Sequence, residues 1–320
     1  MAAGTGTVEA PYGSAEDLGE GILRVTAPNP SPMTHSGTRC YLVGDAEEAV
    51  LIDPGPADAR HRAALLAALG RRRLVAILVT HSHLDHSPGA PALTRETGAP
   101  VFAFGPHGAG TGAQMRALAA GPGGAALGGG EGADAGFMPD RRLADGEAVA
   151  VGDRQIIALH TPGHLSNHLS FRIENSGTIF SGDAVMGWST TLVSPPEGDM
   201  AAQVATLGRL EALVAEMAAG GQRPRFLPGH GPPVAAPAEL LATHIAHRRA
   251  RRAALIAALA DGPANARVFA ERLYTQTPPA LMGAAARNVL ATLLQLAAEG
   301  VAEPCGPLSA AVAFRLTGAS

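Results

Sequence analysis

Four metal-binding side chains lie close together directly after an apolar run at residues 74–79. They are His81, His83, Asp85 and His86. Such a run is typical of a strand buried on both faces, so we expect the cluster at a strand end. Side chains two apart on an extended backbone point the same way, so His81 and His83 could hold one ion. Asp85 and His86 follow at the turn beyond and could face a second ion.

Three downstream residues share this arrangement, because each follows a strand-like run and is preceded by glycine. They are His164, Asp183 and His230. The whole set has histidines and carboxylates but no thiolate, which suits Zn²⁺, although iron and manganese also accept these ligands. One structural zinc needs only four ligands. The surplus therefore predicts two ions with open positions, an arrangement that supplies a bridging hydroxide near neutral pH.

These motifs, with Leu-Ile-Asp-Pro-Gly at residues 51–55, resemble the five motifs of the metallo-β-lactamase-fold hydrolases. The resemblance implies an α+β chain with a four-layer αββα fold. It also implies the division of the ligands: His81, His83 and His164 for the first metal, Asp85, His86 and His230 for the second, and Asp183 between them. Asp85 would also orient the hydroxide as the catalytic residue. Asp53 would support the loops of the site from outside the ligand set.

Three further features refine the resemblance. The best-known lactamases carry cysteine where Asp183 stands, and neither Cys40 nor Cys305 lies in a motif, so penicillin hydrolysis is not the expected main activity. His168 is a candidate for orienting a ligand or touching substrate. His35 lies in a loop that approaches the active site in the family, which makes it a weaker candidate for substrate contact.

The predicted organisation is a catalytic domain at residues 1–238 and a winged-helix domain at 239–320. Helical patterns at 240–260, 266–273 and 284–298, followed by a hairpin within 301–316, resemble the winged helix of one branch of the superfamily. That branch includes an endoribonuclease and fungal polyketide thioesterases. Earlier helices are predicted at 60–69 and 200–219. The Gly- and Ala-rich segment 108–136 is interpreted as a flexible surface excursion, with an active-site flap as the alternative.

The leading functional hypothesis is hydrolysis of a small acyl thioester or ester, and cleavage of single-stranded RNA is the alternative. Two lower-ranked hypotheses are a one-iron sulfur dioxygenase and a DNA-binding regulator. The regulator is ranked low because the third tail helix offers only Arg287, Asn288 and Gln295 for contacts with DNA. The retained His86, Asp183 and His230 favour two metals over one iron.

Composition restricts partners and location. The net charge is −4, and all 24 basic residues are arginine. The chain therefore lacks the excess of basic residues that is typical of a dedicated nucleic-acid binder. The first 18 residues do not resemble a signal peptide, and no uninterrupted apolar run reaches the length of a membrane helix. Two distant cysteines favour a reducing compartment, so we expect a cytoplasmic protein without a membrane partner. Homo-oligomerisation is left open.

Overall fold

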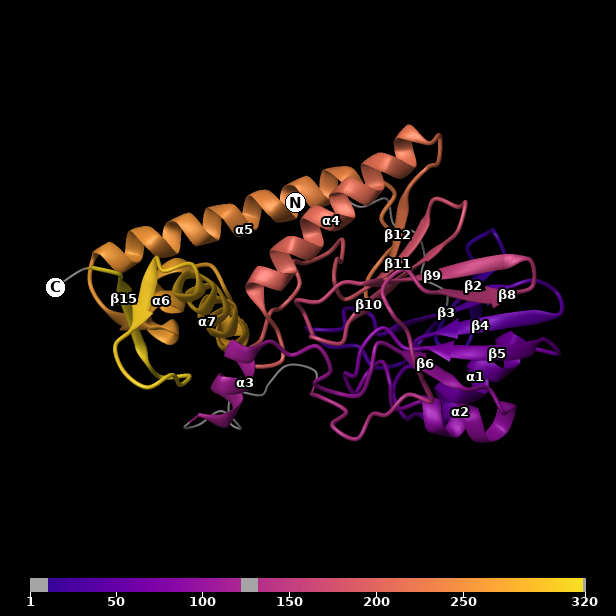
Figure 1. The fold of residues 1–320 in the computed structure, drawn as a ribbon. Coiled ribbons are helices and arrows are strands. Elements are labelled where there is room, and N and C mark those ends of the chain that lie inside the picture. The colour runs from indigo at the N-terminus through magenta and orange to yellow at the C-terminus, as the bar shows by residue number, and fades with distance from the viewer. Residues whose placement is uncertain (1–10, 122–131, 319–320) are drawn as a thin grey trace.

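Two mixed β-sheets face each other and carry helices on their outer faces in the computed structural model, which describes residues 11–121 and 132–318 (Figure 1). The first sheet contains, in spatial order, β1 (Ala15–Asp17), β2 (Ile22–Thr26), β3 (Arg39–Gly44), β4 (Glu48–Ile52), β5 (Arg73–Leu78), β6 (Val101–Ala103) and β7 (Arg141–Arg142). The strands β4 to β7 are parallel, and β1 to β4 are antiparallel.

The second sheet lies against the first and completes the inner layers. Its spatial order is β12 (Arg225–Pro228), β11 (Thr178–Gly182), β10 (Leu169–Ile173), β9 (Arg154–His160) and β8 (Ala148–Val151). Only β11 and β12 pair in parallel within the described sheet. Ile22 and Tyr41 from the first sheet pack with Phe171, Phe180 and Leu227 from the second.

Helices cover both outer faces, which confirms the predicted four-layer αββα arrangement. The helices α1 (Ala59–Leu69) and α2 (Ala90–Thr97) pack on the first sheet, and α4 (Met200–Ala219) and α5 (Pro237–Ala260) pack on the second. The strand β5 shows why this sequence suits a central position. Ala76 and Leu78 face the other sheet, whereas Ile77 and Val79 face the helices, so residues 76–79 are buried on both faces of the sheet.

The C-terminal part forms the predicted winged helix around its own core. It contains the end of α5, α6 (Ala266–Leu273), the short 3-10 helix η2 (Pro279–Leu281), α7 (Met282–Ala298), and the antiparallel strands β13 (Ala264–Asn265), β15 (Ala313–Leu316) and β14 (Ala302–Pro304). Leu255, Phe269, Leu290 and Phe314 fill this core. The described stretch Pro279–Ala298 is long and apolar enough to suit a membrane span by composition alone. Leu290, Leu293, Leu294 and Leu296 of this stretch are buried in this core.

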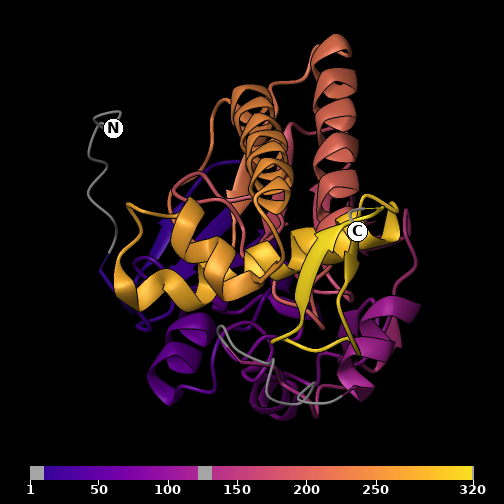
Figure 2. The same ribbon diagram turned by 90° about the vertical axis from the view of Figure 1, so that its left-hand side faces the viewer.

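The helix α5 belongs to both hydrophobic cores. Leu241 near its start packs with α4 against the second sheet, and Leu255 and Leu259 near its end pack in the winged helix. The helix runs beside α4 and joins the two parts of the molecule (Figures 1 and 2). A domain boundary at residue 238 therefore stays a prediction, because the chain there is already inside a continuous helix.

The segment predicted as an aperiodic excursion contains the helix α3 (Ala113–Ala120), so that prediction is wrong for these residues. Met115 and Leu118, spaced three apart, reach the winged-helix core, and Gln114 Nε2 donates to the Leu294 carbonyl at 3.0 Å. Residues 122–131 of the segment lie outside the described part. Where the description resumes, the Gly132 carbonyl accepts a hydrogen bond from Leu84 N at 3.0 Å. The flap hypothesis stays a prediction.

Candidate metal centre

All seven predicted ligands are buried and lie together at one edge of the two sheets. They follow β5, β9, β11 and β12, so four strand ends meet at one site. The side chains form three overlapping groups whose ligand atoms lie within 4.8 Å of one another: His81, His83 and His164; His81, His86 and Asp183; and Asp85, His86 and His230. The first and third groups contain the same residues as the two predicted ligand sets, and Asp183 belongs to the group that shares a histidine with each of them. The assignment of these residues to two ions stays a prediction.

One half of the site consists only of histidines. His83 Nδ1 lies 2.9 Å from His81 Nε2 and 3.0 Å from His164 Nε2. Burial lowers the pKa of His83 to about 3 and holds the pKa of His81 well below its usual value. The rings of His81 and His83 are therefore neutral at physiological pH, which is the form that binds a metal ion.

The other half adds carboxylates. Asp85 Oδ2 lies 3.1 Å from His230 Nε2 and 3.3 Å from His86 Nε2. Burial opposes protonation of His230, but Asp183 and Asp85 outweigh it and raise the pKa of that ring to about 10. Burial also raises the pKa of Asp85, but His86 and His230 hold it well below the usual range. The carboxylates therefore make this half attractive to positive charge.

The residues fit a bound cation, as two independent observations show. Asp85 Oδ1 and Asp183 Oδ1 are buried and have no hydrogen-bond partner in the described part of the chain. Buried carboxylate oxygens are rarely left unsatisfied, and both are close to imidazole nitrogens that also converge here. A Cβ at Gly229 would lie 2.3 Å from Asp183 Oδ1, so the glycine keeps the space open. The site can therefore hold metal.

Asp53 lies outside the ligand set and orients two histidines. Its Oδ2 contacts His86 Nδ1 at 2.8 Å and accepts a hydrogen bond from Thr80 Oγ1, also at 2.8 Å. Thr80 Oγ1 lies 2.9 Å from His81 Nδ1. Partners of this kind fix the ring orientation and the tautomer of metal-binding histidines. The geometry suits the support role expected for Asp53.

His168 is fully buried and contacts the backbone of a ligand. Its Nε2 accepts a hydrogen bond from Asp183 N at 3.0 Å, and its Nδ1 lies 2.9 Å from Thr161 Oγ1. Of the two roles considered for His168, this geometry suits positioning of Asp183. His35 is exposed, and its ring centroid lies 5.3 Å from that of Trp188. Its role as a substrate contact stays a prediction.

A cleft of about 190 Å³ opens beside His164 and Asp183. Its remaining lining comes from a loop near the N-terminus, from the segment after Asp183, and from the winged helix: Pro32, Met33, Met186, Trp188, Ser189, Thr190, Leu192, Tyr274, Thr277, Leu281, Ala284, Ala285 and Asn288. Sequence reasoning did not place Trp188 or Tyr274 at the site. The only available signal was that Trp188 is the single tryptophan of the chain.

The third helix of the winged helix faces this cleft and the catalytic layers. Asn288 Oδ1 accepts a hydrogen bond from Val193 N at 3.0 Å, and Gln295 Nε2 donates to Glu299 Oε1 at 2.9 Å. Eight residues of α7 are buried. Two of the side chains considered for contacts with DNA are therefore engaged within the protein, which argues against the regulator hypothesis.

Two family models match the chain over separate ranges. A model of the metallo-beta-lactamase superfamily matches residues 33–230, and a model of the beta-lactamase associated winged helix domain matches residues 269–304. The chain belongs to the metallo-beta-lactamase superfamily. This membership confirms the family resemblance and makes the chain a member of a metal-dependent hydrolase family.

Two relatives with different names show sequence similarity to this chain. It is 27% identical over 296 residues to a beta-lactamase-like protein 2 homolog from Caenorhabditis elegans, covering 90% of this chain and 88% of that protein. It is 31% identical over 215 residues to the atrochrysone carboxyl ACP thioesterase of Aspergillus fumigatus, covering 66% of this chain but only 56% of the thioesterase.

Solved structures match along nearly the whole chain. A metallo-beta-lactamase family protein from Thermus thermophilus matches with a TM-score of 0.71 and 26% identity, covering 94% of this chain and all of that one (100%). A beta-lactamase domain protein from Burkholderia ambifaria matches with a TM-score of 0.75 and 21% identity, covering 97% and 96%. Both parts of the fold therefore recur together in other members.

Proposed function

We propose that this protein hydrolyses a small acyl thioester or ester with two zinc ions held by the seven clustered residues. Iron or manganese would also suit the ligand types. The name of the Aspergillus fumigatus relative, an ACP thioesterase, supports this substrate class. The main support comes from the cleft beside the metal centre.

The walls of that cleft suit an acyl group. Most of the lining side chains are apolar, with Met33, Met186, Trp188 and Leu192 near the metal ligands and Leu281 on the winged helix. No arginine lines the described cleft, and the chain contains no lysine. A polyanion needs cations along its phosphates, whereas an acyl chain needs apolar contact. The observation that carries the proposal is this apolar, cation-free lining.

The residues of the centre have separable tasks in such a reaction. Bound metal ions would lower the pKa of water and polarise the substrate carbonyl. Thr38 Oγ1 donates to Asp85 Oδ2 at 3.0 Å, which leaves Asp85 Oδ1 free to orient the attacking water and accept its proton. Attack on the carbonyl carbon breaks the bond to sulfur or oxygen, releasing a carboxylate and a thiol or alcohol. Water would protonate the leaving group.

The deciding experiment compares acyl thioesters with single-stranded RNA at low and moderate salt. We expect turnover of thioesters that changes little with salt, and weak cleavage of RNA, because only polyanion binding depends steeply on counterion release. An Asp85→Ala variant controls for contaminating enzymes. Efficient, salt-sensitive and Asp85-dependent RNA cleavage, with thioesters untouched, would reverse the proposal in favour of the ribonuclease alternative.

A further inference from the structure

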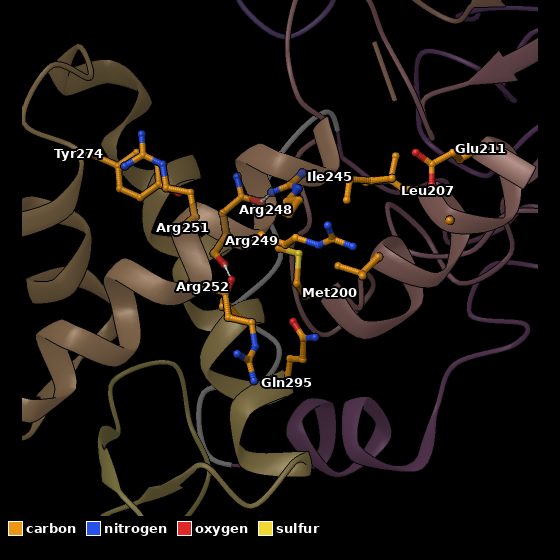
Figure 3. Close-up of a pocket in the computed structure, with 14 residues that line it drawn as sticks. Met200, Leu207, Glu211, Ile245, Arg248, Arg249, Arg251, Arg252, Tyr274 and Gln295 are labelled. Atoms are coloured by element: carbon orange, nitrogen blue, oxygen red, sulfur yellow. Dashed lines mark hydrogen bonds between the residues drawn. The ribbon is translucent and has the colours of Figure 1, made fainter. Parts of the chain in front are cut away.

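A second pocket, of about 300 Å³, lies between α4, α5 and α7 on the other side of Asn288 from the metal centre. Figure 3 shows that apolar side chains, among them Ile245, Met200 and Leu207, lie beside a row of arginines. Its lining includes Met200, Val204, Leu207, Ile245, Arg248 and Arg249. The lining from α4 is apolar except for Glu211, and the lining from α5 consists of Ile245 and four arginines.

The arginines of this pocket differ in their partners. Arg248 donates to the Thr191 carbonyl, and Arg251 donates to the Leu273 carbonyl at 2.9 Å and lies 4.2 Å from the ring centroid of Tyr274. Arg252 pairs with Glu299. Arg249 is exposed at the rim and has no partner within the described part of the chain. One guanidinium is therefore available, next to an apolar surface.

Charge and volume together restrict the occupant. The four arginines face one acidic lining residue, Glu211, and one pairing acid, Glu299, so positive charge is in excess. A guanidinium binds a carboxylate through two parallel hydrogen bonds. A polyanion would need several free cations, but three of the four arginines are already engaged. The volume is near the lower end of small-molecule sites, about 300–1,000 Å³.

We propose that this pocket binds a single-headed anionic amphiphile, a carboxylate with a medium-length acyl chain. The chain would lie along Met200, Val204 and Leu207 on α4, and the carboxylate would pair with Arg249 on α5. Apolar burial favours the chain, and the excess positive charge favours the head group. This inference goes beyond the proposed function and does not rest on it.

The wall of the pocket is hydrogen-bonded to Thr191, and Thr191 and Leu192 are in turn hydrogen-bonded to the ligand candidates Asp183 and His164. Arg248, in its wall, donates to Thr191, and Thr191 Oγ1 donates to the Asp183 carbonyl at 2.7 Å. The next carbonyl along the chain, that of Leu192, accepts from His164 Nδ1 at 2.8 Å. Arg248, a wall residue of the pocket, therefore lies two hydrogen bonds from Asp183, although none of the seven metal-ligand candidates lines the pocket.

Binding of decanoate to the metal-loaded, full-length protein, measured by calorimetry, tests the proposal. Arg249→Ala should weaken binding about five- to tenfold, because a charged hydrogen-bond donor at the rim is lost. Val204 is 38% exposed at the pocket, and Val204→Trp should abolish binding by filling the space without removing charge. Decanol should bind at least about fivefold more weakly than decanoate, since it lacks the charge.

Matched controls separate this site from the metal centre and from the surface. Arg223→Ala removes an exposed arginine elsewhere, and Ala205→Trp adds a bulky residue on α4 outside the pocket, and both should bind decanoate like the wild type. Thermal unfolding checks that each variant is folded. The proposal is overturned if decanoate does not bind, if its affinity is unchanged in Arg249→Ala and Val204→Trp, or if decanol binds equally well. RNA binding that depends on Arg249, without decanoate binding, would assign the pocket to a polyanion instead.

Discussion

The metal centre and the cleft beside it adjoin each other but are built in different ways. Every ligand candidate follows a strand of the two sheets, and buried hydrogen bonds with Asp53, Thr80 and His168 hold these residues in place. The cleft is lined by single residues from a loop, from the segment after Asp183 and from the winged helix, and most of them contribute apolar surface. The two sheets therefore position the metal-ligand candidates, and we expect the choice of substrate to depend on the walls of the cleft.

Loss of the bridging carboxylate should have the largest effect, because it belongs to the fixed region. We expect Asp183→Asn to lower hydrolysis of every substrate by at least about a hundredfold and to reduce bound metal below two ions per chain. Metal analysis and a substrate panel would check this result. Asp153→Asn, an exposed carboxylate without a described partner, is the matched control. One iron per chain together with full activity of Asp183→Asn would contradict the two-metal hypothesis.

The hydrogen bonds behind the ligands should matter less than a ligand but still affect all substrates. His168→Ala removes the acceptor for Asp183 N, so we expect metal affinity and activity to fall about 10- to 100-fold. Competition with a chelator would measure the affinity. His247→Ala on α5 is the control. If His168→Ala changed the preference among substrates but left metal affinity intact, His168 would belong to the cleft instead.

A wall residue should change substrate preference without changing metal content. We expect Trp188→Ala to lower kcat/KM for long-chain acyl thioesters about tenfold, or about 1.4 kcal/mol, because apolar contact is lost. Acetyl thioesters should be little affected. Met138→Ala, at a side chain 69% exposed and outside the cleft, serves as the control. An equal loss for short and long substrates would break the distinction between the two regions.

The last prediction concerns the stability of the layer behind the site and leaves activity at neutral pH unchanged. His61 contacts Cys40 Sγ at 3.2 Å, and burial lowers the pKa of the ring to about 4. Between pH 6.5 and 4 the unfolded chain binds a proton at this ring that the folded chain does not. The free energy of unfolding therefore decreases as the pH is lowered through this window, by up to about 1.4 kcal/mol per pH unit. Urea unfolding should show a steeper loss for the wild type than for His61→Gln, and equal slopes would contradict the assignment.

The same contrast explains what the sequence could and could not predict. Histidine and aspartate after apolar strands can be recognised by residue type, so the sequence predicts the seven candidate ligands that the structure brings together. The sequence also predicts α4 with its bounds Met200–Ala219. Trp188 and Tyr274 carry no such signal. They reach the cleft only because the winged helix packs beside the segment after Asp183, and that packing depends on long-range contacts that no local pattern records. The helix α3 was not predicted for a similar reason, since Met115 and Leu118 are buried only through contacts with the distant winged-helix core.

The continuity of α5 also determines how the cleft could open. A helix of 24 residues is about 36 Å long and resists bending, because a sharp kink breaks its backbone hydrogen bonds. The continuous helix fixes the separation between the winged helix and the sheets. We therefore expect no hinge motion between these two parts at α5. Entry of a substrate would have to rely on movements of side chains and short loops, such as the one that carries Trp188. A rigid support of this kind would let the lining of the cleft vary without a change in the arrangement of the sheets and the winged helix.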